Sequence, residues 1–148
     1  MLINYKINRN KKIVKSKFIV SSIIKNINEK ETIDLQKLID LFNSEYKWEG
    51  MFTIEQAIER IKNGQNLFIL YYKNCAIGYV WFKEIDKQKC FGYNLYVTKK
   101  EKRPGISPYW FYKYVTDYML VNYDTIEVEV EDWNLAIKDI IEMIGYYE

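Results

Sequence analysis

The chain has 148 residues with a formal net charge of +2, and 49% of the residues are apolar. This length and composition predict one folded domain with a hydrophobic core and exclude a disordered segment. The nearly balanced charge argues against a dedicated nucleic-acid-binding protein, because such proteins carry a larger basic excess. The chain contains no histidine, which excludes Ser-His-Asp and Cys-His catalysis and all histidine-ligated metal sites.

The N-terminal residues 1–17 alternate apolar and basic side chains and lack the uninterrupted apolar stretch of a signal peptide. The longest apolar runs of the chain are far shorter than the roughly 20 residues that a membrane span needs. We therefore expect a cytoplasmic protein without a membrane partner. Cys75 and Cys90 lie in predicted strands and are expected to be buried thiols, and two cysteines alone cannot build a structural zinc site. No metal is expected.

The first half of the chain is predicted to contain one strand and two helices. The β-branched stretch Lys17–Ile27 predicts a strand, for which the edge of a sheet is one option. Thr32 is the expected N-cap of a helix whose apolar residues recur at helical spacing over 33–42. After a loop, Thr53 is expected to cap a second helix over 54–62, which an Asn-Gly pair ends.

The middle of the chain is predicted to form three strands, at 66–72, 76–82 and 90–98, because β-branched and aromatic residues dominate these runs. Short turns join the three runs, so they are expected to form an antiparallel meander. The second run contains Gly78 soon after its turn.

The remainder alternates helix and strand. Pro108 is expected to open a helix that ends near residue 121, and residues 124–131 alternate apolar and acidic side chains as a half-buried strand does. Asn134 is the expected N-cap of a last helix with an isoleucine stripe, and residues 146–148 are predicted to begin a short final strand. The resulting order is β-α-α-β-β-β-α-β-α-(β), and its helical crossover makes the sheet mixed.

The basic loop before the helix at Pro108 has the chemistry of an anion-binding site. Gly105 permits a close backbone approach, and Ser107 is a good N-cap for a helix that opens with proline. Free amides at a helix N-terminus favour an anion, and Lys102 and Arg103 add positive charge. The loop is therefore a candidate pyrophosphate site, and the alternative is an ordinary solvated loop.

This loop, at its place in the order of elements, resembles the GNAT superfamily of acyl-CoA-dependent N-acyltransferases. The family pattern Arg/Gln-x-x-Gly-x-Gly/Ala reads Lys-Arg-Pro-Gly-Ile-Ser over 102–107, with the central glycine kept and lysine and serine at the outer positions. Four further residues fall at the spacings of the family: Gly78, Asn134, Gly145 and Tyr146. The resemblance covers 67–147 by motif and the first half only by element order.

The resemblance implies a single GNAT-like domain over 1–148 with an α/β fold, in which about four helices flank a mixed central sheet of about six strands. It implies that acetyl-CoA binds between the strands at 90–98 and 124–131. Backbone groups of residues 95–97 would pair with the pantetheine arm, and the amides of 102–107 would hold the pyrophosphate. The implied cofactor-binding residues are Leu95, Tyr96, Val97, Lys102, Arg103, Gly105, Ile106, Ser107 and Asn134.

The sequence departs from the family at both of the usual proton-transfer positions. Seven residues after Asn134 the family commonly has a tyrosine that acts as general acid, and this chain has Ile141. The strand at 90–97 contains no carboxylate that could take a proton from the amine. The candidate substitutes are Tyr93 and Tyr146, followed by Tyr96, Tyr147 and Cys90. For each of these residues, the alternative to a role in proton transfer is a purely structural role in packing.

Two functions of different classes stay open. The first is a cytoplasmic N-acetyltransferase in which an amine attacks acetyl-CoA directly. The second is a non-catalytic module of the same fold that acts as a CoA-binding, structural or protein-interaction subunit of a larger assembly. Homo-oligomerisation also stays open, and no nucleic-acid partner is expected. Loop side chains that could attract or cover an amine, or could simply be solvated, are Glu45, Trp48, Glu49, Glu84 and Asp86.

Overall fold

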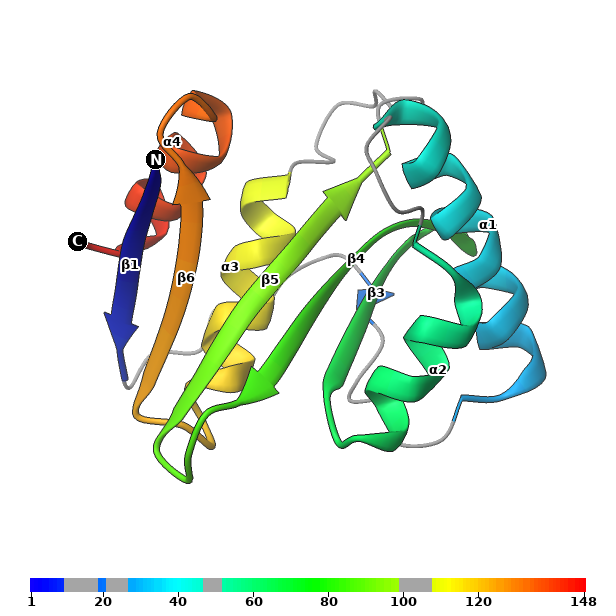
Figure 1. Cartoon of the computed structure of the whole chain (residues 1–148), viewed down its shortest axis with the longest axis horizontal. Coiled ribbons are helices and arrows are strands. Elements are labelled where there is room, and N and C mark those ends of the chain that lie inside the picture. Colours follow the sequence, from blue (N-terminus) through cyan, green and yellow to red (C-terminus); the bar gives the residue numbers. More distant parts are fainter. Residues whose placement is uncertain (10–18, 21–26, 47–51, 99–107) are drawn as a thin grey trace. The chain divides into compact units, whose positions relative to one another are not determined.

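The structure is a computed structural model that describes residues 1–9, 19–20, 27–46, 52–98 and 108–148 (Figure 1). Its helices and strands are β1 (Leu2–Asn8), β2 (Ile19–Val20), α1 (Glu29–Glu45), α2 (Ile54–Lys62), β3 (Asn66–Tyr72), β4 (Cys75–Glu84), β5 (Lys89–Val97), α3 (Pro108–Met119), β6 (Thr125–Glu131) and α4 (Leu135–Ile144). The strands are hydrogen-bonded in the order β1-β6-β5-β4-β3-β2, with β1 antiparallel and β5 parallel to β6. This mixed α/β architecture confirms the predicted fold class.

The element order differs from the predicted one at both ends of the chain. Strand β1 was not predicted; it pairs with β6 from Leu2–Glu131 to Asn8–Thr125. The predicted final strand is reduced to one bridge, in which Lys6 and Tyr147 exchange two backbone hydrogen bonds of 2.9 Å. Within the predicted strand at 17–27, Ile19–Val20 pair with β3, and Ile27 is described outside any strand. Residues 17–18 and 21–26 lie outside the described residues.

Capping side chains determine where the helices begin. The N-cap of α1 is Asn28, whose side chain accepts from the Glu31 N–H at 2.7 Å while the Glu31 carboxylate accepts from the Asn28 N–H at 3.1 Å. This capping box corrects the predicted cap. Thr32 lies inside the helix, and its hydroxyl donates to the Asn28 carbonyl at 2.8 Å. Thr53 and Asn134 cap α2 and α4 as predicted.

The turn between β3 and β4 sets their pairing. Lys73 and Asn74 have φ values of 48° and 65°, both in the left-handed region. Two such residues form a type I′ turn, whose twist matches an antiparallel hairpin. The first half of the predicted meander therefore forms with a two-residue turn.

The chain divides into two compact units, and strands β4 and β5 run from one into the other. Unit 1 comprises Met1–Lys17, Phe82–Tyr93 and Ser107–Glu148, and unit 2 comprises Phe18–Trp81 and Asn94–Ile106. The single domain over 1–148 stays a prediction.

In unit 1, helices α3 and α4 pack on one face of the strands, and α3 lies behind β5 in Figure 1. Tyr112 of α3 stacks on Phe82 of β4 with ring centroids 6.3 Å apart. Tyr146, just after α4, shares a hydrogen bond of 3.0 Å with the Thr116 hydroxyl of α3. Gly92 of β5 lies directly under this layer, since a Cβ there would be 2.9 Å from the Tyr112 hydroxyl. Aromatic packing thus fixes α3 and α4 on this sheet face.

In unit 2, helices α1 and α2 pack on a face of β4 and β5. Phe42 of α1 contacts the ring of Tyr96 with centroids 5.2 Å apart. Trp81 of β4 is fully buried, with Phe52 at 6.4 Å between ring centroids and the Arg60 guanidinium of α2 5.0 Å from its ring centroid. These contacts hold the C-terminal end of α1 over the second half of β5.

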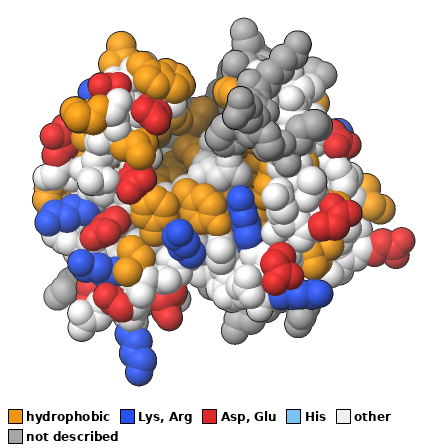
Figure 2. Space-filling view, in the orientation of Figure 1, with side chains coloured by type: hydrophobic (Ala, Val, Ile, Leu, Met, Phe, Trp, Pro, Cys, Tyr) orange, Lys and Arg blue, Asp and Glu red, His pale blue; other side chains and the backbone are white. Residues whose placement is uncertain are grey.

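The charges on the visible face fit the small net charge of +2. Basic, acidic and hydrophobic side chains are interspersed on the face shown in Figure 2. Among the helices that the structure describes, none is long and apolar enough to cross a membrane. Cys75 and Cys90 are both free thiols; Cys90 is buried as expected, and Cys75 is half-buried.

Candidate functional site on strand β5 and helix α1

Strand β5 changes its backbone conformation at Asn94. Its φ of 56° lies in the left-handed region, which asparagine adopts more readily than most residues. The parallel ladder between β5 and β6 ends at the pair Gly92–Val128, two residues before Asn94. The Asn94 side-chain amide donates to the Tyr79 hydroxyl of β4 at 3.4 Å. Asn94 is therefore an irregular point within the strand, comparable to a β-bulge.

Beyond Asn94, the backbone groups of β5 alternate between its two edges. The Thr98 N–H donates to the Ile77 carbonyl of β4 at 2.9 Å. The Tyr96 carbonyl also faces β4, because a Cβ on Gly78 would lie 2.5 Å from its oxygen. Successive residues of a strand direct their backbone groups to opposite edges, so the N–H and C=O groups of Leu95 and Val97 point away from β4. This orientation fits the role that the GNAT resemblance assigns to these two residues.

The side chains of Tyr96 and Thr98 bring a carboxylate from α1 to β5. The Tyr96 hydroxyl donates to Oε2 of Glu45 at 2.5 Å, and the Thr98 hydroxyl donates to the same oxygen at 2.8 Å. Burial, and then the hydrogen bond to Glu45, raise the pKa of Tyr96, so its phenol stays protonated at neutral pH. We call these three residues the Glu45 cluster. Sequence reasoning placed Glu45 in an acceptor loop and missed its contact with β5.

Aromatic rings pack around the Glu45 cluster. The ring of Tyr96 packs against described aromatic rings, with centroid distances of 5.2, 5.5 and 6.1 Å to Phe42, Tyr79 and Tyr46. Tyr46 is 42% exposed, whereas Phe42 and Tyr79 are buried, so the rings reach solvent at Tyr46. The Glu45 cluster therefore lies beside buried aromatic rings, close to the solvent-exposed ring of Tyr46.

Several predicted site residues fall outside the described residues, namely Lys102, Arg103, Gly105, Ile106 and Ser107 of the basic loop and Trp48 and Glu49 of the acceptor loop. The other two acceptor-side carboxylates have local partners. Glu84 accepts from the Tyr123 hydroxyl at 2.8 Å, and Asp86 accepts from N–H groups of its own turn.

The predicted residues of the closing segment belong to unit 1. The Asn134 side chain accepts from the Ile137 N–H at 3.4 Å, and it thus caps α4. Ile141 is 2% exposed within the apolar stripe of that helix. A tyrosine at this position would have to bury its hydroxyl or displace the packing.

The two tyrosines named as substitute acids have different surroundings. Tyr93 is half-buried; its ring stacks on Phe91 at 6.0 Å, and the Lys83 ammonium lies 5.6 Å from its centroid. Tyr146 is 3% exposed and hydrogen-bonded to Thr116, and burial raises its pKa well above the ordinary value. Tyr93 is thus the more accessible of the two.

The remaining substitutes are also placed by the structure. Cys90 is fully buried, and burial raises its pKa to about 12, so the thiol is not ionised at neutral pH. Tyr147 is 44% exposed, and its hydroxyl accepts from the Asn8 side chain at 2.6 Å. In the part of the chain that the structure describes, no group of three acidic or cysteine side chains is arranged to hold a metal.

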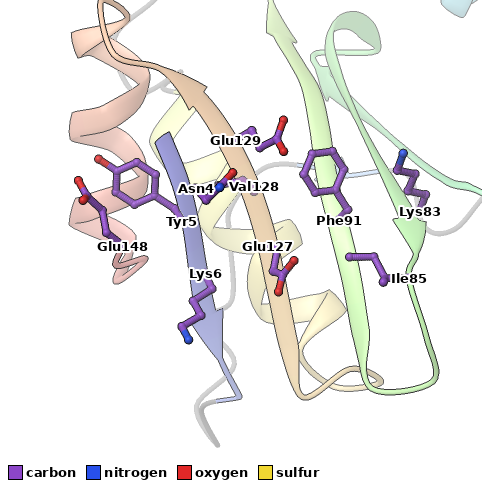
Figure 3. Close-up of a pocket in the computed structure, with 10 residues that line it drawn as sticks. All are labelled: Asn4, Tyr5, Lys6, Lys83, Ile85, Phe91, Glu127, Val128, Glu129 and Glu148. Carbon is purple, nitrogen blue, oxygen red and sulfur yellow. The ribbon is translucent and has the colours of Figure 1, made fainter. Parts of the chain in front are cut away.

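A separate cavity of about 730 Å³ lies on the other sheet face of unit 1. Figure 3 shows the ten residues that line it: Asn4, Tyr5, Lys6, Lys83, Ile85, Phe91, Glu127, Val128, Glu129 and Glu148. Lys83 lies over the Phe91 ring at 5.3 Å, and Glu127 pairs with Lys89 at 3.5 Å. None of the predicted cofactor residues is among these ten, so this cavity is not the predicted site.

Because of the left-handed backbone conformation at Asn94, we expect two substitutions there to change the free energy of unfolding by different amounts. Asn94→Gly is expected to change the free energy of unfolding by less than about 0.5 kcal/mol, because glycine adopts this conformation without strain. Asn94→Ile is expected to lower it by about 2 kcal/mol, because a β-branched residue is strained there. Urea denaturation measures both. Equal losses of unfolding free energy in the two variants would mean that both effects come from the lost hydrogen bond to Tyr79. The left-handed backbone conformation would then contribute nothing measurable.

No protein-family model and no curated protein sequence matches the chain significantly. Solved structures do match. A functionally unknown conserved protein from Staphylococcus epidermidis has a TM-score of 0.68 at 14% identity, covering 99% of this chain and 56% of its own. A putative GNAT-family acetyltransferase from Novosphingobium aromaticivorans has a TM-score of 0.66 at 6% identity, covering 99% of this chain and 60% of its own.

A third similar structure is AAC(6')-Iy in complex with the bisubstrate analog CoA-S-monomethyl-acetylneamine, with a TM-score of 0.63 at 11% identity, covering 90% of this chain and 92% of that one. These similarities show that the chain has the fold of the GNAT acetyltransferases, as the sequence resemblance predicted. The chain spans somewhat more than half the length of the first two structures and most of the third.

Proposed function

We propose that this protein is a cytoplasmic N-acetyltransferase that transfers an acetyl group from acetyl-CoA to an amine. The observation that carries the proposal is the backbone of β5 beyond Asn94, where Leu95 and Val97 direct their N–H and C=O groups away from β4. An extended, amide-containing ligand can pair with such groups as an added strand does. The pantetheine arm of coenzyme A is a ligand of this kind. The CoA-based analog bound to a protein of the same fold supports this choice.

The residues of this chain would act mainly by binding and positioning. Leu95 and Val97 would hold the pantetheine arm, and the loop 102–107, which lies outside the described residues, would bind the pyrophosphate with its amides and basic side chains. When bound, acetyl-CoA supplies an activated thioester. An N–H group of β5 would polarise the thioester carbonyl, as an oxyanion site does. Holding amine and thioester together can supply roughly 7–11 kcal/mol of the barrier reduction.

A non-catalytic module that binds CoA or a protein partner is the second candidate. Two observations favour it: Ile141 is buried where the family commonly has a catalytic tyrosine, and β5 contains no carboxylate. An assay of free CoA release with a panel of amines separates the two candidates. Release that depends on the amine supports the transferase, and acetyl-CoA binding without release supports the module.

Calorimetric titration with acetyl-CoA tests the cofactor site. We expect micromolar binding by the wild type and a loss of at least about tenfold in affinity in Gly105→Glu, because a side chain and a negative charge would enter the pyrophosphate loop. Gln88→Glu, which places the same charge in the exposed turn before β5, is the matched control and is expected to bind normally. A wild type that folds and does not bind acetyl-CoA would refute the proposed function.

A further inference from the structure

The cavity of unit 1 lies apart from the residues that the proposed function uses. Its volume of about 730 Å³ falls within the roughly 300–1,000 Å³ of pockets that hold small ligands. All ten lining residues belong to unit 1, and the proposed cofactor-binding residues are not among them. The cavity is therefore a second candidate site, and a ligand there does not depend on acetyl-CoA binding.

The alternation of side chains along the strands directs charged groups into this cavity. On β6 the apolar residues are buried, so Glu127 and Glu129 point to the opposite face of the sheet. On β4, Phe82 faces α3, so the next residue, Lys83, points to the cavity face. Phe91 of β5 lines the same face. Since the strands are ordered β6-β5-β4, an aromatic ring lies between an acidic and a basic strand.

Two of these charged side chains, Glu129 and Lys83, form no ion pair with any described residue. By contrast, Glu127 pairs with Lys89 at 3.5 Å. The Lys83 ammonium lies 5.3 Å from the ring centroid of Phe91. A contact with a ring face holds a cation in place without neutralising it. One negative and one positive charge thus face the cavity without an ion pair.

The ring of Phe91 lies between these two charges (Figure 3). Adjacent strands are about 4.8 Å apart, so roughly 10 Å separates β6, with Glu129, from β4, with Lys83. Ile85, which is 50% exposed, extends the apolar surface beside Phe91. The other lysine of the cavity wall, Lys6, belongs to β1 on the far side of β6. A ligand that meets both charges therefore has an apolar middle and ends of opposite charge.

We propose that this cavity binds a short zwitterionic peptide of about three residues. An extended chain spans about 3.3–3.6 Å per residue, so three residues match the roughly 10 Å between the charged strands. The N-terminal ammonium contacts the Glu129 carboxylate, and the C-terminal carboxylate contacts the Lys83 ammonium. The middle side chain packs on Phe91. Binding involves no covalent step, and the inference goes beyond the proposed function without depending on it.

Ligands with other charge patterns fit these residues less well. In a free amino acid both charges flank one carbon atom, so the molecule reaches only one of the two side chains at a time. A ligand with a single charge leaves the other side chain without an ion pair. The competing explanation is an ordinary solvated sheet face, because exposed charges contribute little even when they are paired.

Calorimetric titration of the full chain, without acetyl-CoA, tests the proposal with three forms of the peptide Gly-Phe-Gly: the zwitterion, the N-acetylated form and the C-amidated form. We expect saturable binding of the zwitterion with a Kd below about 1 mM, and a loss of at least about threefold in affinity for each blocked form. Glu129→Gln and Lys83→Met should each weaken binding of the zwitterion by a similar factor. Glu131→Gln removes a charge from the same strand outside the cavity, and this matched control should bind normally.

The blocked peptides identify which end of the ligand meets which residue. N-acetylation should lower affinity for the wild type and cause no further loss in Glu129→Gln, because that ion pair is already absent. C-amidation should behave in the same way with Lys83→Met. Both variants are expected to keep the melting temperature of the wild type, because both side chains are exposed. The blocked peptides also test the wild type alone, so the result does not depend on any variant.

Three outcomes would overturn the proposal. They are no saturable binding of the zwitterion by the folded wild type, equal affinity for free phenylalanine, and additive losses when a blocked peptide is combined with the variant at its assigned end. Failure of the wild type to bind acetyl-CoA is a different result. It would refute the proposed function and leave this inference standing.

Discussion

Gly78→Ala is expected to lower the free energy of unfolding by about 3 kcal/mol, more than most single additions of a methyl group. The reason is a collision with the backbone. The added Cβ would lie 2.5 Å from the carbonyl oxygen of Tyr96, which cannot retreat without disturbing the pairing of β4 with β5. Urea denaturation followed by circular dichroism measures the loss.

Gly92→Ala is the matched control for that prediction. There the added Cβ would meet side-chain atoms and no backbone atom, with Phe82 at 2.8 Å and the Tyr112 hydroxyl at 2.9 Å. We expect a loss of only about 1 kcal/mol. A greater loss in Gly92→Ala than in Gly78→Ala would contradict the assignment of the strain at Gly78 to the backbone. Gly78→Ala should also weaken acetyl-CoA binding, because a shift of Tyr96 moves its neighbours Leu95 and Val97.

Alkaline pH is expected to unfold the protein cooperatively between about pH 10 and 12. Burial raises the pKa of one thiol and seven phenols: Tyr5, Tyr71, Tyr79, Cys90, Tyr96, Tyr112, Tyr123 and Tyr146. The folded protein therefore holds protons that the unfolded chain releases. For Cys90 the pKa is raised from 9.0 to about 12.

Stability falls with rising pH because the folded protein and the unfolded chain bind different numbers of protons. Below about pH 8 both states are protonated at these groups, so they do not change stability with pH. Above that pH the unfolded chain binds fewer protons than the folded protein. Each of these groups then lowers the free energy of unfolding as the pH rises, until its folded-state pKa is reached.

Phenolate absorbance and far-ultraviolet circular dichroism, followed together against pH, test this prediction. The rise in phenolate absorbance should coincide with the loss of secondary structure. Tyr112→Phe is expected to move the midpoint to higher pH, because it removes one buried ionisable group. Tyr147→Phe, at a position that is 44% exposed, should leave the midpoint unchanged. Ionisation of most tyrosines near pH 10 with the circular dichroism still native would show the prediction to be wrong.

Most elements of the fold could be predicted from local sequence signals. Helix α2 and strand β3 have the predicted bounds, and Thr53 and Asn134 cap their helices as expected. Hydrogen bonds between residues close in sequence make the helix and its caps, so a short window of sequence contains this information. Strand β3 is recognised from its apolar and aromatic run between turn residues. The cap of α1 was assigned to Thr32 instead of Asn28, because both residue types are good caps and the Asn-x-x-Glu box was overlooked. The alternation of Ile3, Tyr5 and Ile7 was likewise a usable signal for β1.

Local sequence patterns are enough to predict the helices, most strands, the GNAT-like order of elements and the lack of a carboxylate on β5. Tertiary folding brings distant segments together. It paired β1 with β6, over 100 residues away, and it placed the Glu45 carboxylate against Tyr96 and Thr98. An alternating pattern identifies a strand but not its partner, and a helical glutamate has no local mark of the strand that it will contact. Such contacts depend on how whole elements pack, which is why the Glu45 cluster could be found only in the folded chain.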